Sequence, residues 1–438
     1  MTATRPPGAP DGTGGRADSR RYTAGGDEIR IRRRQRGPTS ITPQKAEAAI
    51  AALVTALPVE PRPLAAALGG TLRQDVFAER DNPPFDRVCM DGIAVANRAL
   101  ERGHRSFRIT GLQRAGTEPT TLADPDGAIE VMTGAVLPAG TDCVIPVEEY
   151  EQVGDRVTLR GEAQGGTYRN VQRRGSDGPR GTRMLRAGVR LGAPELAVVA
   201  SAGLAQVEIS RQPAIAVVST GDELIDPGRP IADHQVRRSN AYAIAAALRA
   251  HGFERLHDDH LLDDAVQLRE RLARILAEHD VLVLSGGVSK GKFDLVPEVL
   301  RELGVREVFH RVAQRPGMPM WFGTTGAGRL VFGLPGNPVS TLICLVRYAL
   351  PALTAATGAT PAPPEPIALA AATRAHRALA LFVPARVQTA ADGSRRVVPH
   401  ATSGSGDFLG LAGTDGFVEL APAPADVAAG TVVPFYRW

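Results

Sequence analysis

The chain has 438 residues, of which 43% are hydrophobic and 22% charged, and its formal net charge is +4 at pH 7. A chain of this length is too long to form a single compact core, so we expect several domains. The composition is that of an ordinary globular protein. We find neither an apolar run of about 20 residues nor a secretory signal pattern, so we expect no membrane anchor and a cytoplasmic location.

The first 40 residues are predicted to form a disordered basic tail. They are rich in Gly, Pro, Thr and Arg, and five arginines fall between Arg30 and Arg36. So few apolar residues cannot form a core, and the arginines are best interpreted as a solvated segment. We therefore expect no specific nucleic-acid partner.

Helices and short strands are expected next. Thr42 and Pro43 predict the start of a helix that continues from Gln44 to Leu57, and a second helix is predicted from Leu64 to about Leu72. From about Met90 to Arg174, short β-type runs alternate with Gly and Pro, which indicates a small β domain. A further helix is predicted from Pro194 through Ala202.

Between Pro213 and Leu350, continuous apolar strands alternate with helices. This pattern indicates a parallel sheet that is covered by helices on both faces. A proline-rich linker, Pro361 to Pro366, then leads to a short C-terminal β module. The strands are predicted at Ile215–Ser219, Val281–Ser285 and Val331–Leu334, and the helices open near Ser239, Asp263, Asp294 and Pro338.

Three strand ends of this sheet combine glycines with hydroxyl or amide side chains. Ligands bind beyond the carboxyl ends of the strands in such sheets. Glycines let backbone N–H groups approach an anion, hydroxyls donate hydrogen bonds, and helix N-termini attract negative charge. We therefore predict a phosphate-binding site formed by Ser219, Thr220, Gly221, Asp222, Ser285, Gly286, Gly287, Ser289, Pro335, Gly336, Asn337 and Pro338.

Four acidic residues fall at the same edge: Asp222, Glu223, Asp263 and Asp294. Carboxylates beside a bound phosphate repel it unless a cation bridges them, so the pattern predicts Mg²⁺. Helix capping is the competing interpretation for Asp263 and Asp294.

The chain resembles the molybdopterin molybdenumtransferases, a family that includes the C-terminal domain of gephyrin. The resemblance runs from about Thr42 to the end. It is carried by Met90-Asp-Gly-Ile-Ala94, Thr133-Gly-Ala-Val-Leu-Pro-Ala-Gly-Thr-Asp142, Arg174-Gly-Ser-Asp177, Ser219-Thr-Gly-Asp-Glu223, Ser285-Gly-Gly-Val-Ser289 and Gly333-Leu-Pro-Gly-Asn-Pro338.

The resemblance implies an α/β multidomain fold. A segmented helical domain (residues 41–90 and 175–212) would enclose a β insertion domain (91–174). A parallel-sheet molybdopterin-binding domain (213–358) and a C-terminal β-barrel-like domain (365–438) would follow. A homodimer is implied, with a cleft between the sheet domain of one subunit and the Asp91/Thr133 region of the other.

The implied reaction inserts molybdenum from molybdate into adenylylated molybdopterin and releases AMP, with Mg²⁺ as cofactor. Asp91, Thr133, Glu223 and Asp294 match the catalytic positions, and Glu223, Asp263 and Asp294 would bind the metal. Arg315 would join the three strand-end loops in cofactor binding. The enzyme that adenylylates molybdopterin is the expected upstream partner.

Several residues depart from the family pattern. Arg238 and Lys292 stand where acids are usual, and Met318 replaces a lysine, a local change of about +3 if all three lie near the site. Ile93 and Ser176 replace a tyrosine and a glutamate. These departures keep open a second hypothesis, a non-catalytic molybdopterin-binding paralogue or scaffold.

Two other patterns are weaker. Gly287 to Gly291 satisfies the nucleophile-elbow pattern of α/β-hydrolases, but Ser289 lies beyond the strand end and no oxyanion segment accompanies it. The run His257-Asp-Asp-His260 could suggest a metal site, but it lacks helical histidine spacing. We predict a solvated loop there.

Overall fold

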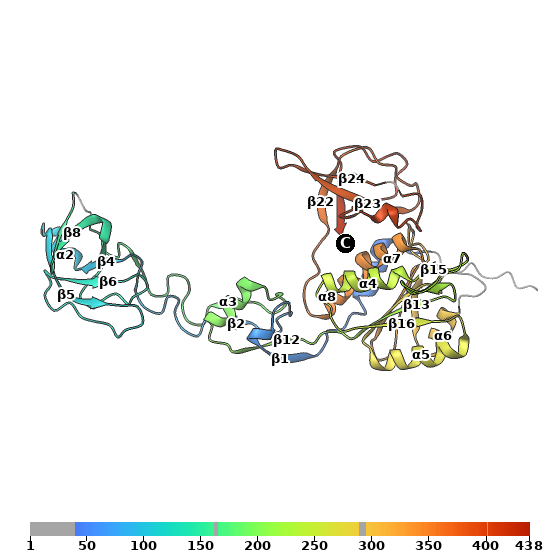
Figure 1. The fold of residues 1–438 in the computed structure, drawn as a ribbon, viewed down its shortest axis with the longest axis horizontal. Coiled ribbons are helices and arrows are strands. Elements are labelled where there is room, and N and C mark those ends of the chain that lie inside the picture. The colour runs from blue at the N-terminus through green and yellow to red at the C-terminus, as the bar shows by residue number, and fades with distance from the viewer. Residues whose placement is uncertain (1–39, 162–164, 289–294, 401) are drawn as a thin grey trace, which may run out of the picture. The chain divides into compact units, whose positions relative to one another are not determined.

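The computed structural model describes residues 40–161, 165–288, 295–400 and 402–438 (Figure 1). The predicted tail, Ser289, Lys292 and Asp294 therefore lie outside the described residues, apart from Ser40 at the end of the tail.

A six-stranded sheet organises the centre of the chain. Its order is β16 (Leu256–Leu261), β13 (Ile215–Thr220), β17 (Val281–Ser285), β21 (Leu330–Leu334), β20 (Trp321–Thr324) and β18 (Arg306–His310). The first four strands are parallel, and three of them, β13, β17 and β21, were predicted, whereas β20 and β18 extend the sheet in antiparallel fashion. The carboxyl ends of β13, β17 and β21 consequently meet at one edge.

Helices cover both faces of this sheet (Figure 1). Alternate residues of β13 point to opposite faces: Ile215 and Val217 join one buried cluster, and Ala216 and Val218 join another. The first cluster contains residues of α4 (Ser239–Ala250), α7 (Pro338–Cys344) and α8 (Leu350–Ala356), and the second contains residues of α5 (Ala265–Glu278) and α6 (Val296–Glu302). Burial on both faces explains why the parallel strands are continuously apolar.

The loop prediction for His257–His260 is wrong, because these residues lie in the edge strand β16. An edge strand pairs on one side only and tolerates polar side chains. Asp258 and Asp259 form ion pairs there with Arg238 and Arg271.

The first helix, α1 (Pro43–Ala51), is shorter than predicted, and its residues Ala46 and Ile50 pack into the core of the sheet domain. The second predicted helix is wrong: only one 3₁₀ turn, Leu64–Ala66, forms in that region. Pro61 and Pro63 precede this turn, and Gly69 beyond it adopts φ +76°, so the chain bends instead of continuing as a helix. It is preceded by β1 (Val59–Pro63), which pairs with β12 (Gln206–Ser210).

The next part of the chain has its own six-stranded sheet. Its order is β7 (Cys143–Pro146), β4 (Gly92–Val95), β6 (Ala128–Val131), β5 (Ser106–Gln113), β9 (Arg156–Leu159) and β8 (Tyr150–Val153). The predicted helix near Pro194 forms as α3 (Ala193–Ser201). Smaller elements complete this region: α2 (Asn97–Glu101), β2 (Val76–Phe77) with β11 (Arg183–Leu185), and β3 (Arg87–Val88) with β10 (Val171–Gln172).

The C-terminal strands close into a five-stranded barrel. The order is β23 (Ala380–Thr389), β24 (Arg395–Pro399), β22 (Glu365–Leu369), β26 (Val432–Arg437) and β25 (Gly416–Leu420), and β25 pairs back onto β23. The short strand β19 (Gln314–Arg315) adds to β23. Closure leaves the barrel without free edges.

One described helical run, Pro338–Ala356, is long and apolar enough to cross a membrane by length and composition. It comprises α7, the π-helical turn Leu345–Ala349 and α8. Since 78% of its most apolar segment is buried inside the protein, it is a core helix.

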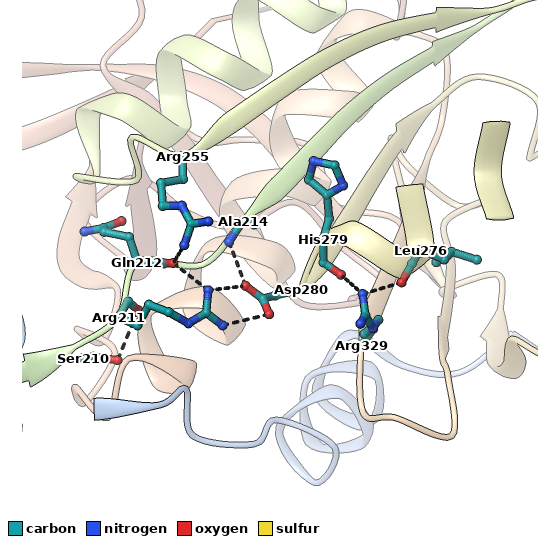
Figure 2. Close-up of polar contacts among 9 residues, drawn as sticks. All are labelled: Ser210, Arg211, Gln212, Ala214, Arg255, Leu276, His279, Asp280 and Arg329. Carbon is teal, nitrogen blue, oxygen red and sulfur yellow. Dashed lines mark hydrogen bonds and ion pairs between the residues drawn. The ribbon is translucent and has the colours of Figure 1, made fainter. Parts of the chain in front are cut away.

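An ion pair between Arg211 and Asp280 lies where the chain enters the sheet domain (Figure 2). Arg211 donates from both Nη atoms to Asp280, at 2.9 Å each, and the Ala214 N–H donates to Asp280 Oδ2 at 2.8 Å. Burial opposes ionisation of Asp280, but Arg211 and Ala214 together hold its pKa below the usual value. The segment before β13 is thus tied to the start of β17.

Candidate functional site

The three predicted strand-end loops lie around one pocket of about 710 Å³. The pocket lies at the carboxyl edge of the parallel strands, where α4 and α7 begin. The lining residues from the sheet domain are Ser219, Thr220, Glu223, Leu224, Ile231, Gln235, Val236, Arg237, Arg238, Ser239, Asn240, Ser285, Gly286, Gly336, Asn337 and Pro338, and the barrel domain adds Gly406 and Phe408.

Two buried hydroxyls on the pocket floor lack hydrogen-bond partners in the described part of the chain. Ser219 is 1% exposed and Thr220 is 4% exposed, yet neither Ser219 Oγ nor Thr220 Oγ1 is paired there. A buried polar atom without a partner costs free energy, and such atoms concentrate where a ligand completes the bonding. The floor of the pocket therefore offers two donors to an anion.

Asn240, at the start of α4, holds the other two loops together. Its Nδ2 donates to Ser285 Oγ at 2.9 Å and to the Gly336 carbonyl at 2.7 Å. Asn240 was not predicted as a site residue, because its role depends on two loops that follow it by 45 and 96 residues.

Gly286 and Gly287 are required by the shape of the floor. Their φ angles are +97° and +63°, and a Cβ atom on either would lie 2.7 Å from an oxygen of Thr220. Both the backbone conformation and the close approach exclude larger residues. The structure thus requires glycine at these two positions for backbone conformation and for packing against Thr220, and their approach to an anion stays a prediction.

The third loop is joined to the C-terminal barrel. Asn337 is the N-cap residue of α7, whose start at Pro338 was predicted, but its side chain makes no capping bond and donates from Nδ2 to Ser405 Oγ at 2.7 Å. The Ser405 carbonyl accepts from the Val339 N–H at 3.1 Å. Part of the N-terminus of α7 is thus occupied by the barrel, which the sequence did not predict.

The predicted acidic residues do not all face this pocket. Glu223 lines it, whereas Asp222 Oδ1 accepts from the Asp263 N–H at 3.0 Å outside the lining set. The capping residue of α5 is Asp264, which accepts from the Gln267 N–H at 2.8 Å, rather than Asp263. Asp294 lies outside the described residues, and no group of three or more His, Cys, Asp or Glu side chains suited to a metal occurs in the parts that the structure describes.

Arg238 lies in the pocket wall within an ion-pair cluster. The residue is 7% exposed, and its Nε donates to Asp226 at 2.7 Å while Nη1 and Nη2 donate to Asp258 at 2.8 and 2.6 Å. The hydrogen bonds that Arg238 donates to Asp258 raise the pKa of the guanidinium, which stays charged, and Arg238 holds the pKa of Asp226 below its usual value. We call these three side chains the Arg238 triad.

Asp91 and Thr133 form a pair in the insertion domain and do not line this pocket. The backbone N–H and Oγ1 of Thr133 both donate to Asp91 Oδ1, at 2.6 and 2.7 Å. The backbone bond, then the hydroxyl, lowers the pKa of Asp91. The pair is exposed and keeps a carboxylate ionised.

Arg315 lies away from the three loops, in a second pocket of about 740 Å³ that Arg374, His376 and Arg377 also line. Nearby, Arg311 Nη2 approaches Met318 Sδ at 3.1 Å, so the neutral residue at 318 faces a cation. Ile93 is fully buried in the core of the insertion domain.

Comparisons with known proteins agree with this architecture. Family models match three consecutive parts: the MoeA N-terminal region (domains I and II) at residues 41–203, a probable molybdopterin-binding domain at 216–355 and the MoeA C-terminal region (domain IV) at 366–438.

Individual relatives cover most of the chain. A molybdopterin molybdenumtransferase of Synechocystis sp. is 37% identical over 84% of this chain and 93% of its own length. Molybdopterin molybdenumtransferase 2 of Mycobacterium tuberculosis is 33% identical over 64% of this chain and 71% of its own. A crystal structure of a molybdopterin biosynthesis MoeA protein from Pyrococcus horikoshii matches with a TM-score of 0.76 and 28% identity, over 91% of this chain and 99% of that one. The chain belongs to the MoeA family of molybdopterin molybdenumtransferases, which act in molybdenum cofactor biosynthesis.

Proposed function

We propose that the pocket at the ends of β13, β17 and β21 binds the phosphate-bearing part of adenylylated molybdopterin, the substrate from which AMP is released. The observation that supports this most directly is the pair of buried, unpartnered hydroxyls of Ser219 and Thr220. They line the pocket together with Gly286 and Gly336. Such donors match the oxygens of a diphosphate.

The residues of this chain would act by positioning and charge neutralisation. Cleavage of a diphosphate link needs the phosphorus held in place and its developing negative charge stabilised, more than it needs a covalent nucleophile. Ser219 and Thr220 would donate to phosphate oxygens, and Asn240 would keep the other two loops in register. Molybdate is the second substrate.

Mg²⁺ fits one feature of the pocket. Magnesium sites near phosphates use one or two carboxylates together with phosphate oxygens and water. Glu223 supplies one exposed carboxylate in the lining, while Asp226 is already paired with Arg238. We propose Glu223 as a ligand of a magnesium ion, which would supply the positive charge that neutralises the phosphate. Asp263 and Asp294 remain proposed ligands.

We propose further that the enzyme is a cytoplasmic homodimer, supplied by the enzyme that adenylylates molybdopterin. The supporting observation is that Asp91 and Thr133 form an ordered polar pair outside the pocket lining. A second subunit could bring such a pair to the pocket. Co-expression of Asp91→Ala and Glu223→Ala chains tests this: a shared site predicts activity in mixed dimers that neither homodimer has. Inactive mixed dimers would contradict it.

AMP release tests the main proposal. Purified protein is supplied with adenylylated molybdopterin, molybdate and Mg²⁺, and AMP is measured over time. We expect release that depends on molybdate and on an intact Thr220. Binding of the pterin without AMP release would overturn the transfer reaction and favour the non-catalytic molybdopterin-binding protein.

A further inference from the structure

A loop of the C-terminal barrel forms part of the pocket in the sheet domain. Gly406 and Phe408 line the pocket together with the ends of the parallel strands. We call residues 403–410, between β24 and β25, the barrel loop. It follows the last strand-end loop of the pocket by more than 60 residues, so its role could not be inferred from spacing along the chain.

The barrel loop is held in a defined conformation. Asp407 accepts from the Ser403 and Gly410 N–H groups, at 2.9 Å each, and these bonds hold its pKa below the usual value. Ser405 bonds to Asn337 and to the Val339 N–H at the start of α7. Phe408, between these anchors, is therefore placed by both domains.

The wall of the pocket near this loop differs in chemistry from the floor. Phe408 is 42% exposed and Ile231 is 42% exposed, and Leu224 and Val236 also line the pocket. An aromatic ring left open to solvent inside a pocket offers a flat apolar face. The floor, by contrast, presents hydroxyls and glycines.

We propose that Phe408 is a specificity-determining residue that stacks on a planar heteroaromatic ring of the substrate while the floor binds its phosphates. The inference rests on the proposed function of the pocket. The ligand class is a phosphate-bearing heteroaromatic compound. Adenine and the pterin are the two rings that adenylylated molybdopterin offers, and both have the flat face that stacking requires.

Titrations with small ligands distinguish recognition of the ring from recognition of the phosphate. AMP, ribose 5-phosphate and 6-hydroxymethylpterin are titrated into the full-length protein by calorimetry. Phe408→Ala is expected to weaken either AMP or the pterin by about tenfold, as loss of a stacked aromatic side chain does. Ribose 5-phosphate, which has no base, should keep its affinity within about twofold.

Two further variants test whether the loss of affinity is due to the aromatic ring of Phe408. Phe408→Tyr should retain ring binding, because the flat face remains. Leu409→Ala is the control, since Leu409 is the adjacent residue, is 85% exposed and does not line the pocket. Weakened AMP binding would assign the stack to adenine, and weakened pterin binding would assign it to the pterin.

Two outcomes would contradict the inference in distinguishable ways. If wild-type protein binds AMP or the pterin and Phe408→Ala binds both equally well, the stacking role is wrong and the proposed function stands. If the wild-type protein binds none of the three compounds, the assignment of the pocket fails and the role of Phe408 fails with it.

Discussion

The guanidinium of Arg238 forms a two-point ion pair with Asp258, and both Nη–O distances are below 2.9 Å. With Asp226 on Nε, the Arg238 triad carries one net negative charge. The expected local change of about +3 from the family pattern therefore does not describe the folded site, since Arg238 is more than neutralised by its neighbours and Lys292 lies outside the described residues.

The triad predicts that Arg238→Asp, which restores the acid usual in the family, destabilises this protein. Three carboxylates would then share the space that the guanidinium occupies. Loss of one partner of a fully buried ion pair is costly. Here Asp226 and Asp258 are half-exposed, so the cost is smaller, and we expect the free energy of unfolding to fall by about 2 kcal/mol. Chemical denaturation would measure it.

The exchanged pair Arg238→Asp with Asp258→Arg should recover part of that loss. Arg271→Ala is the matched control, because Arg271 pairs with Asp259 on the same strand but is exposed, and we expect it to cost less than about 1 kcal/mol. Equal losses for Arg271→Ala and Arg238→Asp would show that the burial of Arg238 adds nothing to the stability of the triad.

Thr220→Val should weaken phosphate binding without destabilising the free protein. The hydroxyl that it removes is buried and unpartnered, so the unliganded protein should be unchanged or slightly more stable. Affinity for AMP should fall by about tenfold or more, as expected for loss of a hydrogen bond to a charged group. Thermal unfolding and calorimetric titration measure the two effects.

Ser285→Ala provides the contrast, because Ser285 Oγ already accepts from Asn240 at 2.9 Å. We expect it to lower the free energy of unfolding by about 1 kcal/mol. A Thr220→Val protein that is clearly less stable yet binds AMP normally would refute the assignment of this hydroxyl to the ligand.

Thr133→Val should shift the ionisation of Asp91 to higher pH. The carboxylate loses the hydroxyl donor at 2.7 Å but keeps the backbone donor at 2.6 Å, so its lowered pKa should move part of the way back to the usual value. If turnover requires ionised Asp91, the acid limb of the rate profile moves upward in pH. Thr133→Ser retains the hydroxyl and should leave that limb in place; identical profiles for the two variants would exclude this coupling.

Asp280→Asn should weaken the attachment shown in Figure 2. Because the folded protein lowers the pKa of Asp280, the ionised side chain contributes stability above its unfolded pKa, and this contribution is lost as pH falls through the folded pKa. We expect a loss of about 1–2 kcal/mol at pH 7 that shrinks toward about pH 3. Urea unfolding at both pH values measures it.

Asp155→Asn is the control, because both side chains of the Asp155–Arg108 pair are mostly exposed to solvent and the pair should contribute little. A difference between wild type and Asp280→Asn that stays constant with pH would rule out the ionised pair as its source.

Much of the site could be predicted because its signals are local. A continuous apolar strand such as Val281–Ser285, followed by Gly286 and Gly287, indicates a buried parallel strand that ends in a tight anion-binding turn. The cap position of Asn337 was local as well, whereas the direction of its side chain was set by Ser405 in another domain. The helix expected at Leu64 failed because it is interrupted by Gly69 at φ +76°, directly after a strand, β1, that pairs with β12 and ends at Pro63.

By itself, the sequence determined the parallel strands, the glycine-rich turns at their ends and the family to which the chain is similar, since each of these depends on neighbouring residues. Only the tertiary structure decided what Arg238 does. Its two carboxylate partners come from the loop before it and from an edge strand that no local pattern revealed. The electrostatic effect of Arg238 on the site depends on its burial and on its distance from its carboxylate partners. The register of β16 beside β13 places Asp258 and so sets that distance.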